Sequence, residues 1–172
     1  MIKPLKIDLP YPDVGKIKPN KQTASIIAPA YAGLHGEITA TLQYLYHRFN
    51  FLQENDKKTA EVLLSISLAE MEHVEILGKT LMQLGVKPVY SLAPPYKYNF
   101  YNTSCVSYSN TPEKMLLDDI SDEISAITQY EEMLKRLDDE YVEAIISRII
   151  LDEQLHIRAL KDVISKDYVK IL

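Results

Sequence analysis

Apolar side chains recur at three- and four-residue intervals through most of this chain, which is the period of an amphipathic α-helix. The pattern predicts four long helices, over residues 25–53, 57–84, 112–137 and 140–166. Helices of this length bury their apolar faces by packing against one another, so we predict an all-α fold, an antiparallel four-helix bundle. The stripe of the first helix that is predicted to face inward contains Ala30, Leu34, Glu37, Thr41, Tyr44 and Leu45.

The predicted helices are bounded by residues that commonly begin or end helices. A Glu-Asn-Asp turn over residues 54–56 separates the first two. Gly85 stands where a left-handed residue ends a helix, and Pro88 prevents continuation. The third helix begins with Thr111 as a possible N-cap and Pro112 in the first helical position.

Three segments lack helical periodicity. Residues 1–24 contain four prolines and a glycine, and we predict an irregular N-terminal arm. Residues 85–111 are rich in Tyr, Pro, Ser and Asn, and form the connection between the second and third helices, here called the crossover. A connection this long allows those two helices to run parallel, whereas the short turns elsewhere require antiparallel neighbours. Residues 167–172 are predicted to be a short tail.

Two copies of one motif stand on the inward stripes, Glu70-x-x-His73 and Glu153-x-x-His156. A lone glutamate lies 33 residues before the first copy and 30 residues before the second. Residues three apart share one face of a helix, so each Glu and His can bind the same ion. The alternative is that these are solvated polar positions on helix surfaces. The predicted metal ligands are Glu37, Glu70, His73, Glu123, Glu153 and His156.

The charge of this set predicts how many ions it binds. Four carboxylates converging in a core are very unfavourable unless they are neutralised, and two divalent cations supply the matching charge. Carboxylates are oxygen donors that can bridge two ions, and imidazole suits iron and manganese. Structural zinc prefers Cys and His, so the expected cofactor is two iron ions or two manganese ions per bundle.

Neighbouring side chains are candidates for supporting roles. Asp152 can accept a hydrogen bond from the free N–H of His73, or it lies on the surface. Tyr44 and Tyr130 each follow a lone glutamate by seven residues, hence by two turns on the same face. Either tyrosine can donate to a bridging carboxylate or carry an oxidising equivalent; packing in the core with a satisfied hydroxyl is the simpler interpretation.

Further residues leave alternatives open. Asp119 is a weaker candidate for a carboxylate partner in the half of the bundle that lacks an Asp beside its motif. Gly33 and Gly36 give a substrate or another helix close access, or they mark a late helix start. We expect His35 and His47 to point away from the site and to have no special role.

Composition excludes several classes. With 172 residues, 47% of them apolar and 25% charged, the chain suits a single domain. No apolar run is long enough to span a membrane, and the first residues lack a secretory signal, so we expect a cytoplasmic protein. A net charge of −5 gives no basic face for nucleic acid. The single Cys105 excludes an internal disulfide framework and the paired Cys-x-x-Cys of a rubredoxin-type iron site.

The duplicated motif and its upstream glutamates resemble the ferritin-like superfamily of di-iron-carboxylate proteins, which includes bacterioferritins, rubrerythrins and manganese catalases. The resemblance covers residues 25–166. Within it, residues 36–45 are more similar to the first helix of manganese catalases and related spore-coat proteins than to that of ferritins. The resemblance implies that Glu70 and Glu153 bridge the two ions. It also places Glu37 and His73 on one ion, and Glu123 and His156 on the other.

The resemblance implies an oxidoreductase that consumes hydrogen peroxide or dioxygen, with a role in oxidative stress. Disproportionation of peroxide needs no electron donor, whereas a rubrerythrin-like peroxidase needs an external donor protein. An iron-binding or ferroxidase protein is the alternative function. A coat or shell subunit with a stabilising metal pair is a further alternative. By analogy we expect a homo-oligomer.

Overall fold

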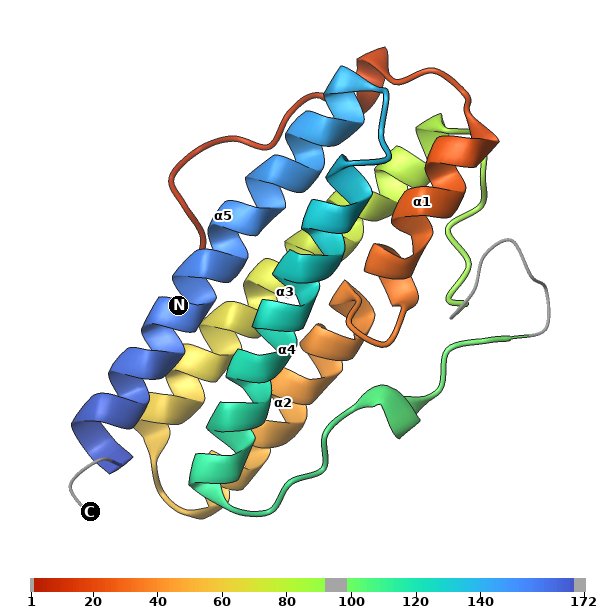
Figure 1. The fold of residues 1–172 in the computed structure, drawn as a ribbon. Helices are drawn as coiled ribbons and strands as arrows, with labels where there is room; N and C mark the ends of the chain where they lie inside the picture. The colour runs from red at the N-terminus through yellow and green to blue at the C-terminus, as the bar shows by residue number, and fades with distance from the viewer. Residues whose placement is uncertain (1, 92–98, 169–172) are drawn as a thin grey trace.

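A computed structural model of the chain describes residues 2–91 and 99–168 (Figure 1). Four long helices pack side by side as the predicted bundle, and a long connection joins the second to the third. In chain order the elements are η1 (Val14–Lys16), α1 (Lys21–Ala32), α2 (Glu37–Gln53), α3 (Lys57–Gln83), η2 (Thr103–Cys105), α4 (Pro112–Leu134), α5 (Glu140–Val163) and the π-helical turn η3 (Ile164–Tyr168).

The prediction of one continuous helix over residues 25–53 is wrong, because the structure divides this segment between α1 and α2. The helix also begins earlier than predicted, since the Asn20 side chain accepts hydrogen bonds from the N–H groups of Gln22 and Thr23 and caps α1. The irregular arm therefore ends at residue 20 instead of 24. Leu34 falls in the turn between the two helices and is exposed, not inward-facing.

Gly33 and Gly36 make this turn possible. A Cβ on Gly33 would lie 2.4 Å from the carbonyl oxygen of Pro29, and a Cβ on Gly36 would lie 2.7 Å from the backbone nitrogen of Gly33. Only glycine permits the backbone to fold this tightly, because backbone atoms cannot move aside as a flexible side chain can. The Thr39 hydroxyl donates to the Gly33 carbonyl at 2.9 Å and holds the turn against α2. Of the two interpretations, a late start of the metal-binding helix is the one observed.

The other helix boundaries agree closely with those predicted. Asp56 accepts from the Thr59 N–H and caps α3, and Gly85, with φ of 81°, follows its end in the left-handed region. Thr111 occupies the N-cap position of α4, although its side chain makes no capping hydrogen bond. The third and fourth helices end three residues earlier than predicted, and η3 extends the fourth. Residues 92–98 of the crossover and 169–172 of the tail lie outside the described residues.

Two apolar clusters fill the bundle, one on each side of a polar layer. Along both α3 and α5, the motif lies between residues of one cluster and residues of the other. The first cluster includes Ile27, Leu77, Leu81, Tyr130, Ile145 and Ile149. The second includes Tyr44, Phe51, Leu63, Ile66, Leu116 and Leu160. The motif therefore lies in the middle of the bundle, where packed apolar side chains separate it from water at either end.

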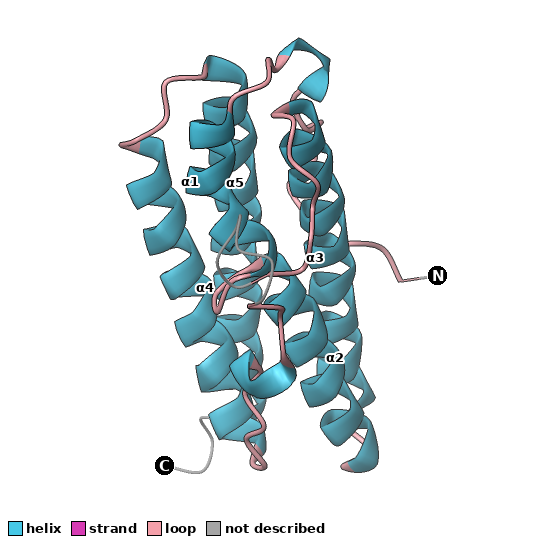
Figure 2. Cartoon of the chain, turned by 90° about the vertical axis from the view of Figure 1, so that its right-hand side faces the viewer, coloured by secondary structure: helices cyan, strands magenta, loops and turns pink. Residues whose placement is uncertain are grey.

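The two irregular segments cover different faces of the bundle. The N-terminal arm contacts α3 and α5, where the Leu5 N–H donates to the Ser65 carbonyl at 2.8 Å and Arg148 donates to the Ile7 carbonyl at 2.8 Å. The crossover contacts α2 and α4 through Ser107, whose N–H donates to Gln43 and whose hydroxyl donates to Asp118, both at 2.7 Å. Figure 2 shows the crossover passing across the front of the bundle.

Among the described residues, no helix is both long enough and apolar enough to cross a membrane.

Candidate metal centre

All six candidate ligands lie in the polar layer and are at most 3% exposed. Glu37 is the first residue of α2, and Glu123 lies in the middle of α4. The two Glu-x-x-His motifs occupy the middle of α3 and of α5. The structure therefore brings together the side chains that the sequence places on four separate helices.

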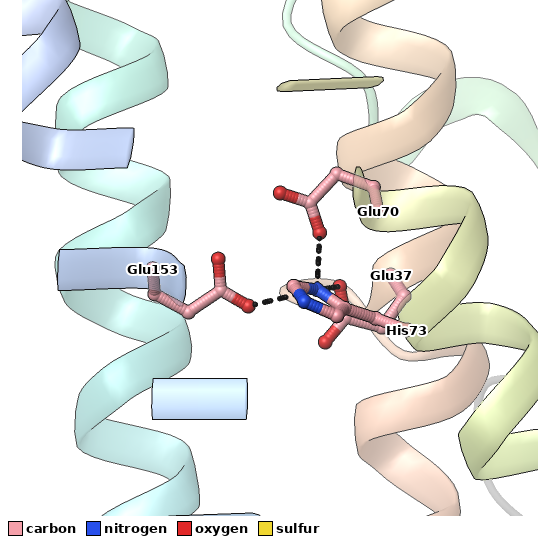
Figure 3. A group of neighbouring side chains, drawn as sticks. All are labelled: Glu37, Glu70, His73 and Glu153. Atoms are coloured by element: carbon pink, nitrogen blue, oxygen red, sulfur yellow. Dashed lines mark hydrogen bonds and ion pairs between the residues drawn. The ribbon is translucent and has the colours of Figure 1, made fainter. Parts of the chain in front are cut away.

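The six side chains form two overlapping groups, each able to hold a metal ion. In each group the potential ligand atoms lie within 4.8 Å of one another. Glu70 and Glu153 belong to both groups, so these two carboxylates lie between the two positions. The first group is Glu37, Glu70, His73 and Glu153, shown in Figure 3. The second group is Glu70, Glu123, Glu153 and His156.

The surroundings of each inner imidazole nitrogen test whether cations fit here. His73 Nδ1 lies 3.0 Å from Glu70, 3.3 Å from Glu37 and 3.3 Å from Glu153 (Figure 3). A single N–H can donate well to only one of these carboxylates. One oxygen of Glu70 and one of Glu153 accordingly remain buried without a hydrogen-bond partner among the described residues. Three carboxylates converging on one nitrogen suit a cation, and the donor set is the hard-oxygen and imidazole type that iron and manganese accept.

The second inner nitrogen repeats this arrangement. His156 Nδ1 lies 2.9 Å from Glu70, 2.9 Å from Glu153 and 3.3 Å from Glu123. The two rings are 6.1 Å apart between centroids. The bundle thus contains two equivalent positions joined by a shared pair of carboxylates.

The outer imidazole nitrogens fix the tautomer of each ring. His73 Nε2 lies 3.2 Å from Asp152, and His156 Nε2 lies 2.8 Å from the carbonyl oxygen of Leu5. A carbonyl can only accept, so Nε2 of His156 carries its hydrogen. In the neutral ring Nδ1 then presents a lone pair toward the carboxylates, as a metal ligand requires. The contact with Asp152 was anticipated from the sequence, whereas the contact with the N-terminal arm was not.

Asp152 is itself held by several donors. The Ile7 N–H donates to it at 2.7 Å, the Tyr11 hydroxyl at 2.9 Å, and Arg148 forms an ion pair with it at 2.7 Å. Burial raises the pKa of Asp152, but the hydrogen bonds from His73, Arg148 and Ile7 outweigh burial and hold this pKa well below its ordinary value. A permanently ionised Asp152 keeps the outer nitrogen of His73 protonated.

Two tyrosines link the helices that carry the lone glutamates. The Tyr44 hydroxyl, on α2, donates to Glu123 on α4, and the Tyr130 hydroxyl, on α4, donates to Glu37 on α2. Each tyrosine therefore bonds the glutamate of the opposite helix, and neither bonds one of the two shared carboxylates as the sequence interpretation had allowed. Both hydroxyls are satisfied in the core, in line with the simpler interpretation.

The electrostatics of the metal-free site show how the protein balances its charge. Burial, reinforced by the charges of Glu70 and Glu153, raises the pKa of Glu37 and of Glu123 well above the ordinary value. Burial also raises the pKa of Glu70, but a hydrogen bond from Glu37 and the two imidazoles outweigh it and lower this pKa. The two imidazoles lower the pKa of Glu153 in the same way, against burial and the charge of Glu70.

The pKa values of the two imidazoles complete this picture. Burial lowers the pKa of His73 and of His156, but the surrounding carboxylates outweigh burial and raise both pKa values. These shifts favour protons on the two inner nitrogens and on Glu37 and Glu123 when no cation is bound.

The expectation that His47 points away from the site is wrong, and the weaker candidate role of Asp119 is not observed. His47 is fully buried, with Nδ1 2.8 Å from Asp119 and Nε2 3.2 Å from the carbonyl of Ser107. Asp119 consequently pairs with His47, and no hydrogen bond among the described residues joins it to either motif imidazole. His35 lies at the surface, 3.5 Å from Asp122. The sequence signal for the buried pair was the position of Asp119 on the inner stripe, which requires a polar partner on the facing helix.

A cavity of ≈ 20 Å³ lies between α2 and α4 and ends at the metal centre. Its lining runs from the exposed Leu34 and the partly exposed His35 to the buried Glu70 and Glu153. A volume of this size holds about one water-sized molecule. Molecules with one or two heavy atoms therefore fit next to the shared carboxylates.

The fold and the paired groups together define a carboxylate-bridged dinuclear metal site in a four-helix bundle. The family model described as a ferritin-like domain matches residues 32–167, and the chain belongs to this family. This agrees with the resemblance seen in the motifs.

Two sets of relatives are similar over most of the chain. A probable manganese catalase of Clostridium acetobutylicum is 24% identical, over 86% of this chain and 72% of that protein. The crystal structure of KatB, a manganese catalase from Anabaena, covers 92% of this chain and 78% of its own, with 21% identity and a TM-score of 0.77.

The bacterioferritin of Rhodobacter capsulatus, described as having a metal-free dinuclear site and haem iron, covers 87% of both chains with 22% identity and a TM-score of 0.71. The similarity of this chain to these solved structures shows a shared fold.

Proposed function

We propose that this chain is a dinuclear metal oxidoreductase that disproportionates hydrogen peroxide. The observation that carries the proposal is the small cavity ending at Glu70 and Glu153, the two carboxylates common to both metal groups. A molecule there lies next to both positions at once. The description of two of the similar proteins as manganese catalases supports peroxide as substrate and manganese as cofactor.

The chain's own residues have distinct tasks in this chemistry. Two manganese or iron ions, when bound, supply a two-electron exchange with peroxide. The four glutamates and two histidines of the polar layer hold those ions. Asp152 and the Leu5 carbonyl orient the imidazoles, and the tyrosine hydroxyls hold the two lone glutamates. The apolar clusters exclude bulk water, while the cavity limits entry to very small molecules.

The test is to load the purified chain with Mn(II) or with Fe(II) and to follow peroxide loss and dioxygen release, with and without a reductant. We expect rapid loss of peroxide without a reductant, with one dioxygen released for every two peroxide molecules consumed. Loss only in the presence of a reductant would instead favour a peroxidase that uses an external electron-donor protein. Two bound but inert ions would favour a structural subunit.

Iron handling is a second candidate, and one observation favours it. Two further carboxylates, Asp119 and Asp122, line the cavity that leads to the metal centre. A path lined by carboxylates attracts cations such as Fe(II). Uptake of many iron atoms per chain, with dioxygen consumed and peroxide left unchanged, would favour this function over peroxide disproportionation.

A further inference from the structure

A second buried polar group adjoins the metal centre on the side of the cavity. His47 and Gln43 lie one turn apart on α2, and Asp119 faces them from α4. All three side chains are at most 2% exposed. His47 Nδ1 and Gln43 Nε2 both contact the same oxygen of Asp119, Oδ1, at 2.8 and 2.9 Å.

The crossover fixes the protonation of this group. His47 Nε2 lies 3.2 Å from the carbonyl oxygen of Ser107, which can only accept, so Nε2 carries a hydrogen. The Ser107 N–H donates in turn to Gln43 Oε1 at 2.7 Å, which orients the amide so that its NH₂ faces Asp119. The other ring nitrogen of His47, Nδ1, then faces Asp119 Oδ1 in a hydrogen bond.

The second carboxylate oxygen of Asp119, Oδ2, has different surroundings from the first. Oδ2 is buried and has no hydrogen-bond partner among the described residues, although Asp119 lines the cavity together with Tyr44, Glu70, Glu123 and Glu153. An unpartnered buried carboxylate oxygen costs free energy unless a molecule in the cavity donates a hydrogen bond to it. Asp119 therefore presents an acceptor to whatever occupies the cavity.

The chemistry of the cavity selects the occupant. Several carboxylates line it, so an anion is disfavoured. Its volume of ≈ 20 Å³ excludes larger organic molecules. The free acceptor requires a molecule that carries an O–H or N–H group, which dioxygen does not. Hydrogen peroxide is neutral, small and carries a hydrogen on each oxygen.

We propose that Asp119 binds hydrogen peroxide in this cavity, accepting a hydrogen bond from it at Oδ2 and then taking its proton. This inference rests on the proposed function and adds the residue that binds the substrate. Transfer of the proton to Asp119 leaves a hydroperoxide anion, and no electron moves in this step. In the overall conversion of two peroxide molecules into two waters and one dioxygen, Asp119 gives this proton back to a product water. His47 is a positioning residue, since it acts through Asp119.

The test compares peroxide turnover and metal content in Asp119→Asn, His47→Gln and Glu132→Gln. Asn at position 119 keeps the size of the side chain but can place an NH₂ donor where the free acceptor was. We expect Asp119→Asn to lower kcat/KM for peroxide by about 100-fold with both ions still bound. For His47→Gln we expect kcat to fall by about tenfold with KM nearly unchanged.

Glu132→Gln is the matched control. Glu132 lies on the same helix as Asp119, is exposed, and forms an ion pair with Lys135 at the surface. This variant removes one carboxylate from α4 but leaves Asp119, His47, Gln43 and Ser107 in place, so its turnover should match that of the unmodified chain.

A readout without turnover is the crystal structure of the metal-free protein. There we expect an ordered solvent molecule within hydrogen-bond distance of Asp119 Oδ2. Normal turnover by Asp119→Asn would overturn the inference and leave the proposed function standing. Loss of ions from that variant would also overturn it, because Asp119 would then act by holding the centre together. Absence of turnover in the unmodified chain would overturn both proposals.

Discussion

The two halves of the bundle, α2 with α3 and α4 with α5, present equivalent ligands but support them in different ways. Each half contributes one lone glutamate and one Glu-x-x-His motif, and each provides a tyrosine that bonds the lone glutamate of the other half. The supports differ at the lone glutamates and at the imidazoles. Glu37 begins a helix after a tight turn, whereas Glu123 lies within a continuous one.

The outer contacts of the imidazoles differ as well. His73 bonds an ionised side chain, Asp152, while His156 bonds a backbone carbonyl in the N-terminal arm. A carboxylate partner makes a ligating imidazole a stronger donor than a carbonyl partner does. Two ions bound here would therefore have imidazole ligands of different donor strength, although both ligand sets contain the same types of residue. The ligands and their tyrosine partners are therefore duplicated, whereas the helix start at Glu37 and the outer contacts of the imidazoles are not.

Substitution of a shared ligand should have the largest effect. Glu70 belongs to both metal groups, so we expect Glu70→Ala to reduce the metal content from two ions per chain to almost none. Glu37 belongs to one group only, and Glu37→Ala should lose chiefly the ion of its own half. Elemental analysis of both variants checks this contrast. Retention of two ions by Glu70→Ala would show that the shared carboxylates are not ligands.

Asp152→Asn should weaken one half selectively. The amide can turn an NH₂ group toward the protonated Nε2 of His73, and Arg148 loses its charged partner. We expect the affinity of the ion next to His73 to fall by roughly 10- to 100-fold, with the second ion much less affected. Titration calorimetry with Mn(II) resolves the two ions. The control is Asp162→Asn, an exposed residue on the same helix, and equal weakening of both ions would contradict the asymmetry.

The turn before Glu37 should be sensitive to a single methyl group. A Cβ at Gly36 would lie 2.8 Å from the carbonyl oxygens of Pro29 and Ala30, so Gly36→Ala should destabilise the protein by about 1–3 kcal/mol. Gly78→Ala is the matched control. Its Cβ would meet the Tyr31 ring at 3.5 Å, an ordinary contact, and alanine favours a helix.

Thermal unfolding measures both of these glycine variants. We expect the midpoint to fall for Gly36→Ala and to stay level or rise for Gly78→Ala. Equal midpoints in the two variants would show that the turn tolerates a side chain.

The pH dependence of stability should test a property that the two halves share, the protonation of their buried ligands. The raised pKa values of Glu37, Glu123 and both motif imidazoles mean that the metal-free folded chain binds protons that the unfolded chain releases. That contribution to stability is present at low pH and is lost as pH rises through the folded-state pKa values. The lowered pKa values of Glu70 and Glu153 act oppositely, but only below their ordinary value of 4.5.

Bound ions replace those protons, so the stabilisation by metal should grow as the pH rises through the raised pKa values. The difference between the unfolding midpoints with and without Mn(II) should increase by about a few degrees per pH unit. A constant or shrinking difference would mean that the ions do not displace these protons.

Much of the fold and of the candidate centre could be predicted from the sequence because both depend on side-chain spacing. The three-residue interval within each motif places Glu and His on one helix face. The contact of Asp152 with His73 was one of the two locations that the sequence allowed for Asp152. The turn at residues 33–36 was only one of two interpretations of Gly33 and Gly36, because the apolar period continues through it. Backbone packing at the glycines, which periodicity does not report, decides the outcome.

Other features depend on contacts that no local pattern encodes. The partner of His156 is a carbonyl, which every residue carries, so nothing marks Leu5 in the sequence. The pairing of His47 with Asp119 depends on how α2 and α4 are rotated toward each other, and only the assembled bundle fixes that rotation.

The most direct test of this account is anomalous X-ray diffraction from crystals of the protein loaded with manganese. We predict two peaks per chain, one beside Nδ1 of His73 and one beside Nδ1 of His156, with Glu70 and Glu153 in contact with both. A single peak, or peaks only at the protein surface, would contradict the assignment of a dinuclear centre.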